Sequence, residues 1–401
     1  MISQRTLFLQ HVGQTSPCPM GLEIEKAEGI YLFDTLGKRY IDLVSGVSVS
    51  NVGHRHPKVV EAIKNQVDKY MHLMVYGEII QKPQVDFAKK LVDCLGQPFE
   101  SVYFVNSGSE AIEGALKLAK RTTGRREILA FKNAYHGSTH GALSIYGGDE
   151  LNRAVKPLLP GVGFMEFNSI PSLDAITSKT ACVVMEVIQA EAGVIQADRE
   201  FIQAVRQRCN ETGALLIFDE IQTGFGRTGA LFAFQHFNIQ PDIICLAKGM
   251  GGGMPIGAFA SSKKLMDTLT FNPVLGHITT FGGHPVSCAA GLAALQVILD
   301  ESLDKAATPK GNLFRDLLKH AAIMDIRGKG LFMAVELDAA FDRDLFFKKC
   351  LEKGIMYDYF LFTQTAFRIA PPLTITGEEI HQTVALLLEA MDEVNFVRSK
   401  I

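Results

Sequence analysis

The sequence lacks several features that would assign it to a class at once: a basic excess, a long apolar run, a repeat period and a low-complexity tract. Its 40 Lys and Arg residues face 43 Asp and Glu residues, for a net charge of −3, whereas nucleic-acid binders usually carry a clear basic excess. No apolar run approaches the roughly 18 residues of a membrane span. With 401 residues, 47% of them hydrophobic, the chain has length for a large core. We therefore expect a globular protein that binds neither nucleic acid nor membrane.

Paired cysteines are also absent. The seven cysteines form no CxxC pair, and Cys182 and Cys245 lie inside apolar runs. Reduced, buried thiols explain this usage better than a disulfide framework or a zinc site. The N-terminal residues lack the apolar core of a signal peptide. We expect a cytoplasmic protein without a metal site.

Short apolar segments alternate with segments of helical periodicity through the middle of the chain. We predict strands at residues 101–106, 127–131, 181–188, 214–221 and 242–248, and helices at 58–69, 84–95, 109–122, 199–211 and 285–300. Runs rich in Val, Ile and Leu between helices are typical of an α/β fold with a mainly parallel sheet covered on both faces. We place a large domain at 51–290 and expect the arm at 1–50 and residues 291–401 to form a smaller α+β domain.

Three places in the large domain carry residues suited to chemistry. The turn Asn-Ser-Gly-Ser-Glu at 106–110 joins a strand to a helix, where backbone amides can hold a phosphate, although a plain Ser-capped turn has the same pattern. Asp219 ends an apolar strand and suits a protonated ring nitrogen, or a structural ion pair with Arg227. Lys248 ends another apolar strand before the glycine-rich residues 249–253. Burial lowers the pKa of such a lysine, as a Schiff base requires, but a lone Lys is more often a surface residue.

Asp219 and Lys248 together are more specific than either residue alone, because they end adjacent predicted strands. A pyridoxal-phosphate site requires a lysine that binds the aldehyde and an acid on the pyridinium nitrogen. The turn at 107–109 supplies a third element, a phosphate site. The sequence therefore predicts a pyridoxal-phosphate site.

From about residue 20 to 376 the chain resembles the class III (ω-amino acid type) aminotransferases of the fold-type-I pyridoxal-phosphate superfamily. The segments that carry the resemblance include NSGSEAIEGALKLA, AYHGST, TTFGGHPVSCAA and FRIAPPL, and the most specific are DEIQTGFGRTG and AKGMGGGMPIGA. The resemblance implies a homodimer with shared sites, in which Thr280 reaches the phosphate bound by the neighbouring subunit.

The resemblance also implies the residues that contact the cofactor: Gly108, Ser109, Tyr135, Asp219, Ile221, Gln222, Lys248 and Thr280. Lys248 forms the Schiff base and then moves the proton, and Asp219 keeps the ring nitrogen protonated. Tyr135 and Ile221 pack on the two faces of the ring. His136 and His284 are interpreted as structural histidines, and Arg227 as a brace for the loop that carries it.

For the substrates, the resemblance implies that Arg368 binds the α-carboxylate of 2-oxoglutarate or glutamate. Glu191 pairs with this arginine and masks it when the amine donor binds. An arginine suits this role because its guanidinium can donate to both carboxylate oxygens at once.

The sequence departs from the family pattern around the donor. Ser138 in YHGST stands where ornithine- and acetylornithine-type enzymes carry an arginine for a distal carboxylate, and Val47 stands where ornithine enzymes carry a tyrosine. The stretches HGSTHGALS and PLLPG are similar to diamine (putrescine-type) aminotransferases. Met74 and Tyr76 are candidate pocket residues.

We therefore predict a ping-pong aminotransferase that passes the amino group of an amine or ω-amino acid to 2-oxoglutarate. An ornithine/acetylornithine, 4-aminobutyrate or diamine enzyme is the alternative within this class. Further alternatives are an aminomutase, decarboxylase or racemase on the same scaffold, and a non-catalytic cofactor-binding protein. Consumption of 2-oxoglutarate would distinguish a transaminase from all of these.

Overall fold

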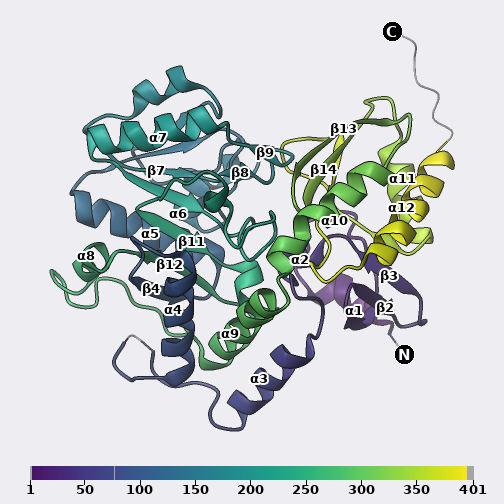
Figure 1. Ribbon diagram of the computed structural model, residues 1–401, viewed down its shortest axis with the longest axis horizontal. Coiled ribbons are helices and arrows are strands. Elements are labelled where there is room, and N and C mark those ends of the chain that lie inside the picture. The colour runs from purple at the N-terminus through teal and green to yellow at the C-terminus, as the bar shows by residue number, and fades with distance from the viewer. Residues whose placement is uncertain (1, 76, 395–401) are drawn as a thin grey trace.

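The computed structural model describes residues 2–75 and 77–394, and it divides visibly into a larger part around a central sheet and a smaller part beside it (Figure 1). The helices are α1 (Gln4–His11), α2 (Ser45–Ser48), α3 (Pro57–Val67), α4 (Lys82–Leu95), α5 (Gly108–Thr123), α6 (His140–Ser144), α7 (Arg199–Thr212), α8 (Lys263–Met266), α9 (Pro285–Asp300), α10 (Leu303–Leu317), α11 (Arg343–Glu352) and α12 (Gly377–Asp392). The strands are β1 (Ile24–Glu28), β2 (Tyr31–Asp34), β3 (Arg39–Asp42), β4 (Ser101–Val105), β5 (Glu127–Phe131), β6 (Val162–Met165), β7 (Thr180–Met185), β8 (Ile188–Gln189), β9 (Ile195–Gln196), β10 (Leu215–Asp219), β11 (Ile243–Leu246), β12 (Gly257–Ser261), β13 (Ile323–Lys329), β14 (Phe332–Leu337), β15 (Ile355–Met356) and β16 (Ala366–Ile369).

The central sheet has seven strands in the order β4-β12-β11-β10-β7-β5-β6. Its pairs are parallel from β11 to β6, so the predicted α/β fold with a mainly parallel sheet is confirmed. Strand β12, which the sequence pattern did not predict, runs antiparallel to both β11 and β4. The strand predicted at 181–188 ends earlier, at Met185, because the chain turns there into β8, which pairs with β9 instead of the central sheet.

Helices α5 and α7 cover opposite faces of this sheet. Successive side chains of a strand point to opposite faces. Cys182 and Val184 of β7 belong to the apolar cluster that contains the buried residues of α5. Val183 and Met185 belong to the cluster that contains the buried residues of α7. This double coverage explains why the inner strands read as unbroken apolar runs.

The smaller part joins the two ends of the chain, because β15 pairs in parallel with β3 at Ile355 and Ile41. A second sheet, β13-β14-β16, lies beside it, and α10, α11 and α12 pack nearby (Figure 1). The proposed domain boundaries near residues 50 and 290 stay predictions.

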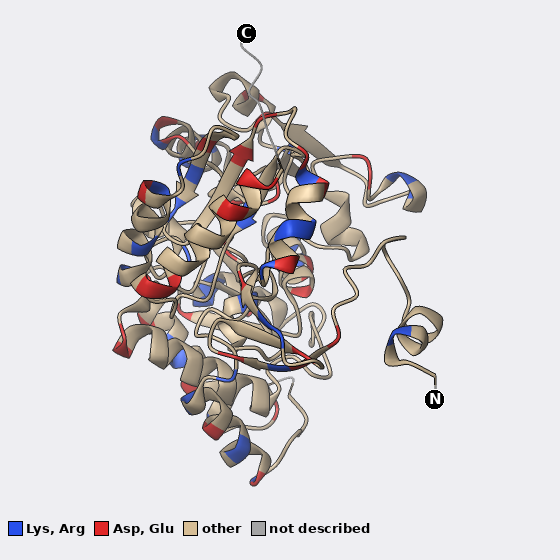
Figure 2. Cartoon of the chain, turned by 90° about the vertical axis from the view of Figure 1, so that its right-hand side faces the viewer, with Lys and Arg blue, Asp and Glu red and all other residues tan. Residues whose placement is uncertain are grey.

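The charged residues do not gather by sign on the face shown in Figure 2, where blue and red segments alternate along the elements and α1 stands away from the body. Within the described residues, no single helix has both the length and the apolar character to cross a membrane. The pair α9 and α10, bent by 64°, passes that test only when the two helices are taken together.

Candidate active site

A cavity of about 410 Å³ lies where β10 and β11 end and α5 begins. Most residues predicted to contact the cofactor line it: Gly108, Ser109, Tyr135, Asp219, Ile221, Gln222 and Lys248. The rest of the wall comes from Val49, Asn106, Ser107, His136, Gly137, Glu186, Ala247 and residues 253–256. Ligands of α/β sheets bind at the carboxyl ends of strands, and this volume is in the range of small-molecule sites.

Lys248 follows β11 and begins the 3-10 turn η4 (Lys248–Gly251). Its φ of 51° lies in the left-handed region, which is uncommon outside glycine and concentrates at functional sites. Its Nζ donates to Gln222 Oε1 at 2.9 Å. Burial lowers the pKa of Lys248, as the sequence predicted, while Glu191 and Arg368 act on it in opposite directions. The lowered pKa favours the neutral amine, which is the nucleophilic form.

Asp219 ends β10 opposite Cys245 of β11, so the predicted adjacency of the two strands is confirmed. Its Oδ1 accepts from the Ile221 amide at 2.9 Å, a turn that ends the strand two residues earlier than the sequence pattern predicted. Its Oδ2 lies 2.7 Å from His136 Nδ1.

His136, interpreted from the sequence as a structural histidine, lines the cavity and contacts the predicted catalytic acid. Burial alone would lower the pKa of His136, but the hydrogen bond and the charge of Asp219 outweigh burial and raise it. Burial in turn raises the pKa of Glu186 to about 7, against the charge of His136. Asp219, His136 and Glu186 therefore lie together in the cavity wall, and the charges of Asp219 and Glu186 both favour protonated His136. No spacing in the sequence identified His136, because it is adjacent to Asp219 only in the folded chain.

The turn before α5 has both of the properties weighed from the sequence. Ser107 caps the helix, with its Oγ accepting from the Glu110 amide at 3.2 Å. The amides of Gly108 and Ser109, at the start of the helix, have no intrahelical partner and suit a phosphate. Gly137 lies against this turn with φ 128°, and a Cβ there would come within 2.1 Å of Ser109 Oγ, so a side chain at this position would disturb the turn.

Arg227, the alternative partner weighed for Asp219, lies elsewhere. It is fully buried and donates to the carbonyls of Leu331 and Pro371 and to Asn51 Oδ1. Its role as a brace is therefore confirmed by these contacts, and it ties the loop after β10 to the smaller part of the chain.

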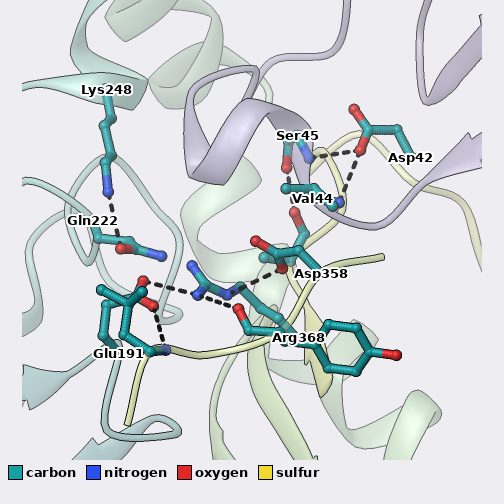
Figure 3. A network of polar contacts seen from close by, with 11 residues as sticks. Asp42, Val44, Ser45, Glu191, Gln222, Lys248, Asp358 and Arg368 are labelled. Atoms are coloured by element: carbon teal, nitrogen blue, oxygen red, sulfur yellow. Dashed lines mark hydrogen bonds and ion pairs between the residues drawn. The ribbon is translucent and has the colours of Figure 1, made fainter. Parts of the chain in front are cut away.

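Arg368 and Glu191 do not line the cavity. They lie next to it, and the lining residues Lys248 and Gln222 point toward them (Figure 3). Arg368 Nη2 donates to Glu191 Oε1 at 2.8 Å, and the guanidinium stacks on the Phe360 ring at 4.7 Å. The side chain of Arg368 is 1% exposed. The structure thus brings together the predicted substrate pair, which is far apart in sequence.

The remaining predicted residues lie outside this cavity. Thr280 follows Thr279, whose Oγ1 accepts from Asn106 Nδ2 at 3.2 Å, and does not line the cavity of its own chain. Ser138 lies at the rim, with its Oγ 3.1 Å from Tyr135 Oη. Met74 is 49% exposed and away from the lining, and Tyr76 is outside the described residues.

Comparison with known proteins identifies the family of this fold and site. Residues 13–391 match the family model of class-III aminotransferases. An acetylornithine aminotransferase from Archaeoglobus fulgidus is 39% identical, over 91% of this chain and 94% of its own length. The ornithine aminotransferase structure from Toxoplasma gondii, which holds pyridoxal phosphate at partial occupancy, aligns with a TM-score of 0.90 at 30% identity, over 97% of this chain and 93% of that one.

A taurine:2-oxoglutarate aminotransferase from Bifidobacterium kashiwanohense, solved with pyridoxal phosphate and glutamate, aligns with a TM-score of 0.89 at 30% identity, over 97% of each chain. The family match and these likenesses span nearly the whole chain, and they agree with a cavity built around a half-buried lysine and a buried acid. The protein belongs to the class III aminotransferases and is a pyridoxal-phosphate-dependent enzyme of fold type I.

Proposed function

We propose that the protein transfers an amino group from an amine or ω-amino acid to 2-oxoglutarate by a ping-pong reaction. The observation that carries this proposal is the buried Arg368–Glu191 pair facing Lys248 across the site. An arginine that can bind a carboxylate near the reactive lysine suits an oxoacid substrate. The paired Glu191 suits a site that must bind this oxoacid in one half-reaction and exclude it in the other.

The cavity fits a flat, phosphorylated ring. Among the described residues, Gln222 Nε2 and His136 Nε2 are buried without a hydrogen-bond partner, so polar groups at the cavity remain available to a ligand. The α5 amides at 108 and 109 would hold the phosphate, Asp219 the ring nitrogen, and Lys248 the aldehyde. When bound, pyridoxal phosphate supplies an electron sink for the substrate carbon.

The residues of this chain divide the remaining work. Lys248, with its lowered pKa, would hold the aldehyde through Nζ. Once the substrate amine has displaced it from the aldehyde, the freed Nζ would carry a proton to and from the substrate carbon. Asp219 holds the proton on the ring nitrogen, and His136 orients Asp219 through the 2.7 Å contact. Glu191 covers Arg368 while the amine donor occupies the site and moves aside for the acceptor carboxylate.

The donor has two candidates, each supported by a different observation. The similarity to acetylornithine aminotransferases of several organisms favours an ornithine-type donor. Ser138, which cannot replace an arginine as a carboxylate reader, favours a donor without a distal carboxylate. A panel of N-acetylornithine, 4-aminobutyrate, diamines and α-amino acids, each with 2-oxoglutarate and read out as glutamate, tests both. Failure of every donor to yield glutamate would refute the proposal.

We also propose a homodimer, in which Thr280 contributes to the neighbouring site. Large apolar side chains are exposed together along 271–281, including Phe271 at 69%, Val274 at 72% and Ile278 at 55%. Exposed apolar surface of this kind marks protein–protein contacts. Sedimentation of the holoenzyme tests the assembly, and a monomer would contradict it. The cytoplasmic location expected from the sequence remains a prediction.

A further inference from the structure

Arg368 is held by a second carboxylate, Asp358, to which the proposed mechanism gives no role. Arg368 Nε and Asp358 Oδ1 form an ion pair at 3.3 Å, on the side of the guanidinium away from Glu191 (Figure 3). The side chain of Asp358 is 30% exposed, whereas that of Arg368 is 1% exposed. A single buried cation therefore lies between two carboxylates.

The two carboxylates are attached to the arginine in different ways. Asp358 is a cross-strand neighbour: the Arg368 amide donates to the Asp358 carbonyl at 3.0 Å, and the next residues, Tyr359 and Phe367, form an antiparallel bridge. Directly paired residues of antiparallel strands project on the same face, so backbone register fixes Asp358 beside Arg368. Glu191 comes from the turn between β8 and β9, in the larger part of the chain.

The guanidinium nitrogens of Arg368 differ in their contacts. The Tyr359 carbonyl accepts a hydrogen bond from Nη2 at 3.3 Å, and the guanidinium lies over the Phe360 ring. Asp358 Oδ1 holds Nε by charge at 3.3 Å, without the geometry of a hydrogen bond. Nη1 is buried without a hydrogen-bond partner among the described residues. When Glu191 moves away, Nη2 also loses a partner, and these two nitrogens form the pair that a carboxylate can bind.

We infer that Asp358 is a positioning residue for the acceptor: it keeps the Arg368 guanidinium in its binding orientation when Glu191 leaves. Asp358 acts through Arg368 and touches neither substrate nor cofactor. The inference rests on the proposed function of Arg368 as the reader of the acceptor carboxylate.

The position of Asp358 also has a pH consequence. Burial raises the pKa of Asp358 to about 6, against the lowering effect of Arg368 and with further charges from Glu191, Asp42 and Lys248 acting on it. The acceptor carboxylate takes the place of the Glu191 charge beside Arg368, so any difference between the effects of these two charges on Asp358 appears as a pH dependence of binding in this range.

The test uses the holoenzyme and glutarate, an unreactive dicarboxylate, with binding measured by calorimetry between about pH 5.5 and pH 8. Alanine at 358 also removes a negative charge, and this loss alone would strengthen anion binding. Weaker glutarate binding in this variant would therefore show that the Arg368 guanidinium is no longer held in position. We expect Asp358→Ala to weaken glutarate binding about tenfold. The rate of the 2-oxoglutarate half-reaction at low substrate concentration should also fall about tenfold, whereas the rate of the amine half-reaction should change less than about twofold.

The matched variant Asp358→Asn keeps an oxygen beside Nε but cannot titrate. We expect it to bind glutarate within about threefold of wild type at the high end of the pH range and to lack Asp358's part of the pH dependence, since the ligand's own titration is common to both proteins. Asp344→Asn, an exposed acid of the same part of the chain, is the control and should match wild type.

The outcomes separate this inference from the proposed function. Wild-type glutarate affinity in Asp358→Ala, or an equal loss in both half-reactions, would overturn the positioning role. If alanine at 358 prevents folding, the asparagine variant decides, and an unchanged pH profile refutes the inference. If wild type binds no glutarate and Arg368→Ala changes nothing, the proposed function fails first.

Discussion

Replacing Glu191 with Gln tests the switch between the two substrates. Glutamine keeps the shape and one oxygen of the side chain but removes the charge that faces Arg368 at 2.8 Å. In the proposed reaction, Glu191 covers this cation whenever the amine donor is bound. The variant should therefore favour carboxylate substrates over donors that carry no carboxylate at this position.

The size of the effect follows from the burial of the pair. Two unit charges about 4 Å apart attract by ~4 kcal/mol at an effective dielectric constant near 20, but desolvation offsets much of that. With Glu191 10% and Arg368 1% exposed, we expect a charge-assisted hydrogen bond of about 1.5–3 kcal/mol to remain. The ratio of kcat/KM for the amine donor to kcat/KM for glutamate should therefore fall about 10- to 100-fold.

The assay is stopped-flow measurement of each half-reaction separately, with Glu166→Gln as the matched control. Glu166 pairs with Lys132 on the surface, where both side chains are 56% exposed, and exposed pairs contribute little. An unchanged ratio in Glu191→Gln, or the same change in the control, would refute the switch.

Three further predictions concern the cofactor and the fold. Lys248→Ala should lose the visible absorbance of the lysine-bound cofactor, and retention of that spectrum would exclude Lys248 as the attachment site. Gly137→Ala should weaken cofactor binding in an equilibrium titration of the apoenzyme, because the new Cβ would meet Ser109 Oγ at 2.1 Å; wild-type affinity would contradict this. Arg227→Met should lower the free energy of unfolding by about 3 kcal/mol or more and lower the thermal midpoint, because its buried hydrogen-bond acceptors lose their donor. The control Arg208→Met, which removes a partly exposed arginine, should change neither quantity.

The central sheet was predictable because its inner strands are buried on both faces. Strand β7 reads as an apolar run, and the prediction for it was wrong only at its end, where Glu186 turns inward to contact the backbone of Ala190. Strand β12 was not predicted, because Gly257–Ser261 has small side chains apart from Phe259 and shows no alternation of polar and apolar residues. Its antiparallel pairing depends on β4 and β11, which lie far from it in sequence.

Some residues of the candidate site were predictable from the sequence and others were not. Asp219 and Lys248 were predictable, because Asp219 ends one recognisable strand, Lys248 lies two residues beyond the end of the next, and parallel neighbours end at the same edge. The contacts of His136 and Asp358 were not, since both depend on tertiary neighbours. Asp358 is adjacent to Arg368 only through the pairing of Tyr359 with Phe367, which no local pattern indicates.

In the proposed reaction, the site exchanges an amino group with the glutamate/2-oxoglutarate pair, whose carboxylate Arg368 binds. The most direct measurement mixes the holoenzyme with glutamate in the absence of any acceptor and quantifies the 2-oxoglutarate released. We expect stoichiometric release by wild type and, at the same glutamate concentration, a large loss of rate in Arg368→Ala. No 2-oxoglutarate from wild type, or an equal rate in the variant, would contradict this proposal.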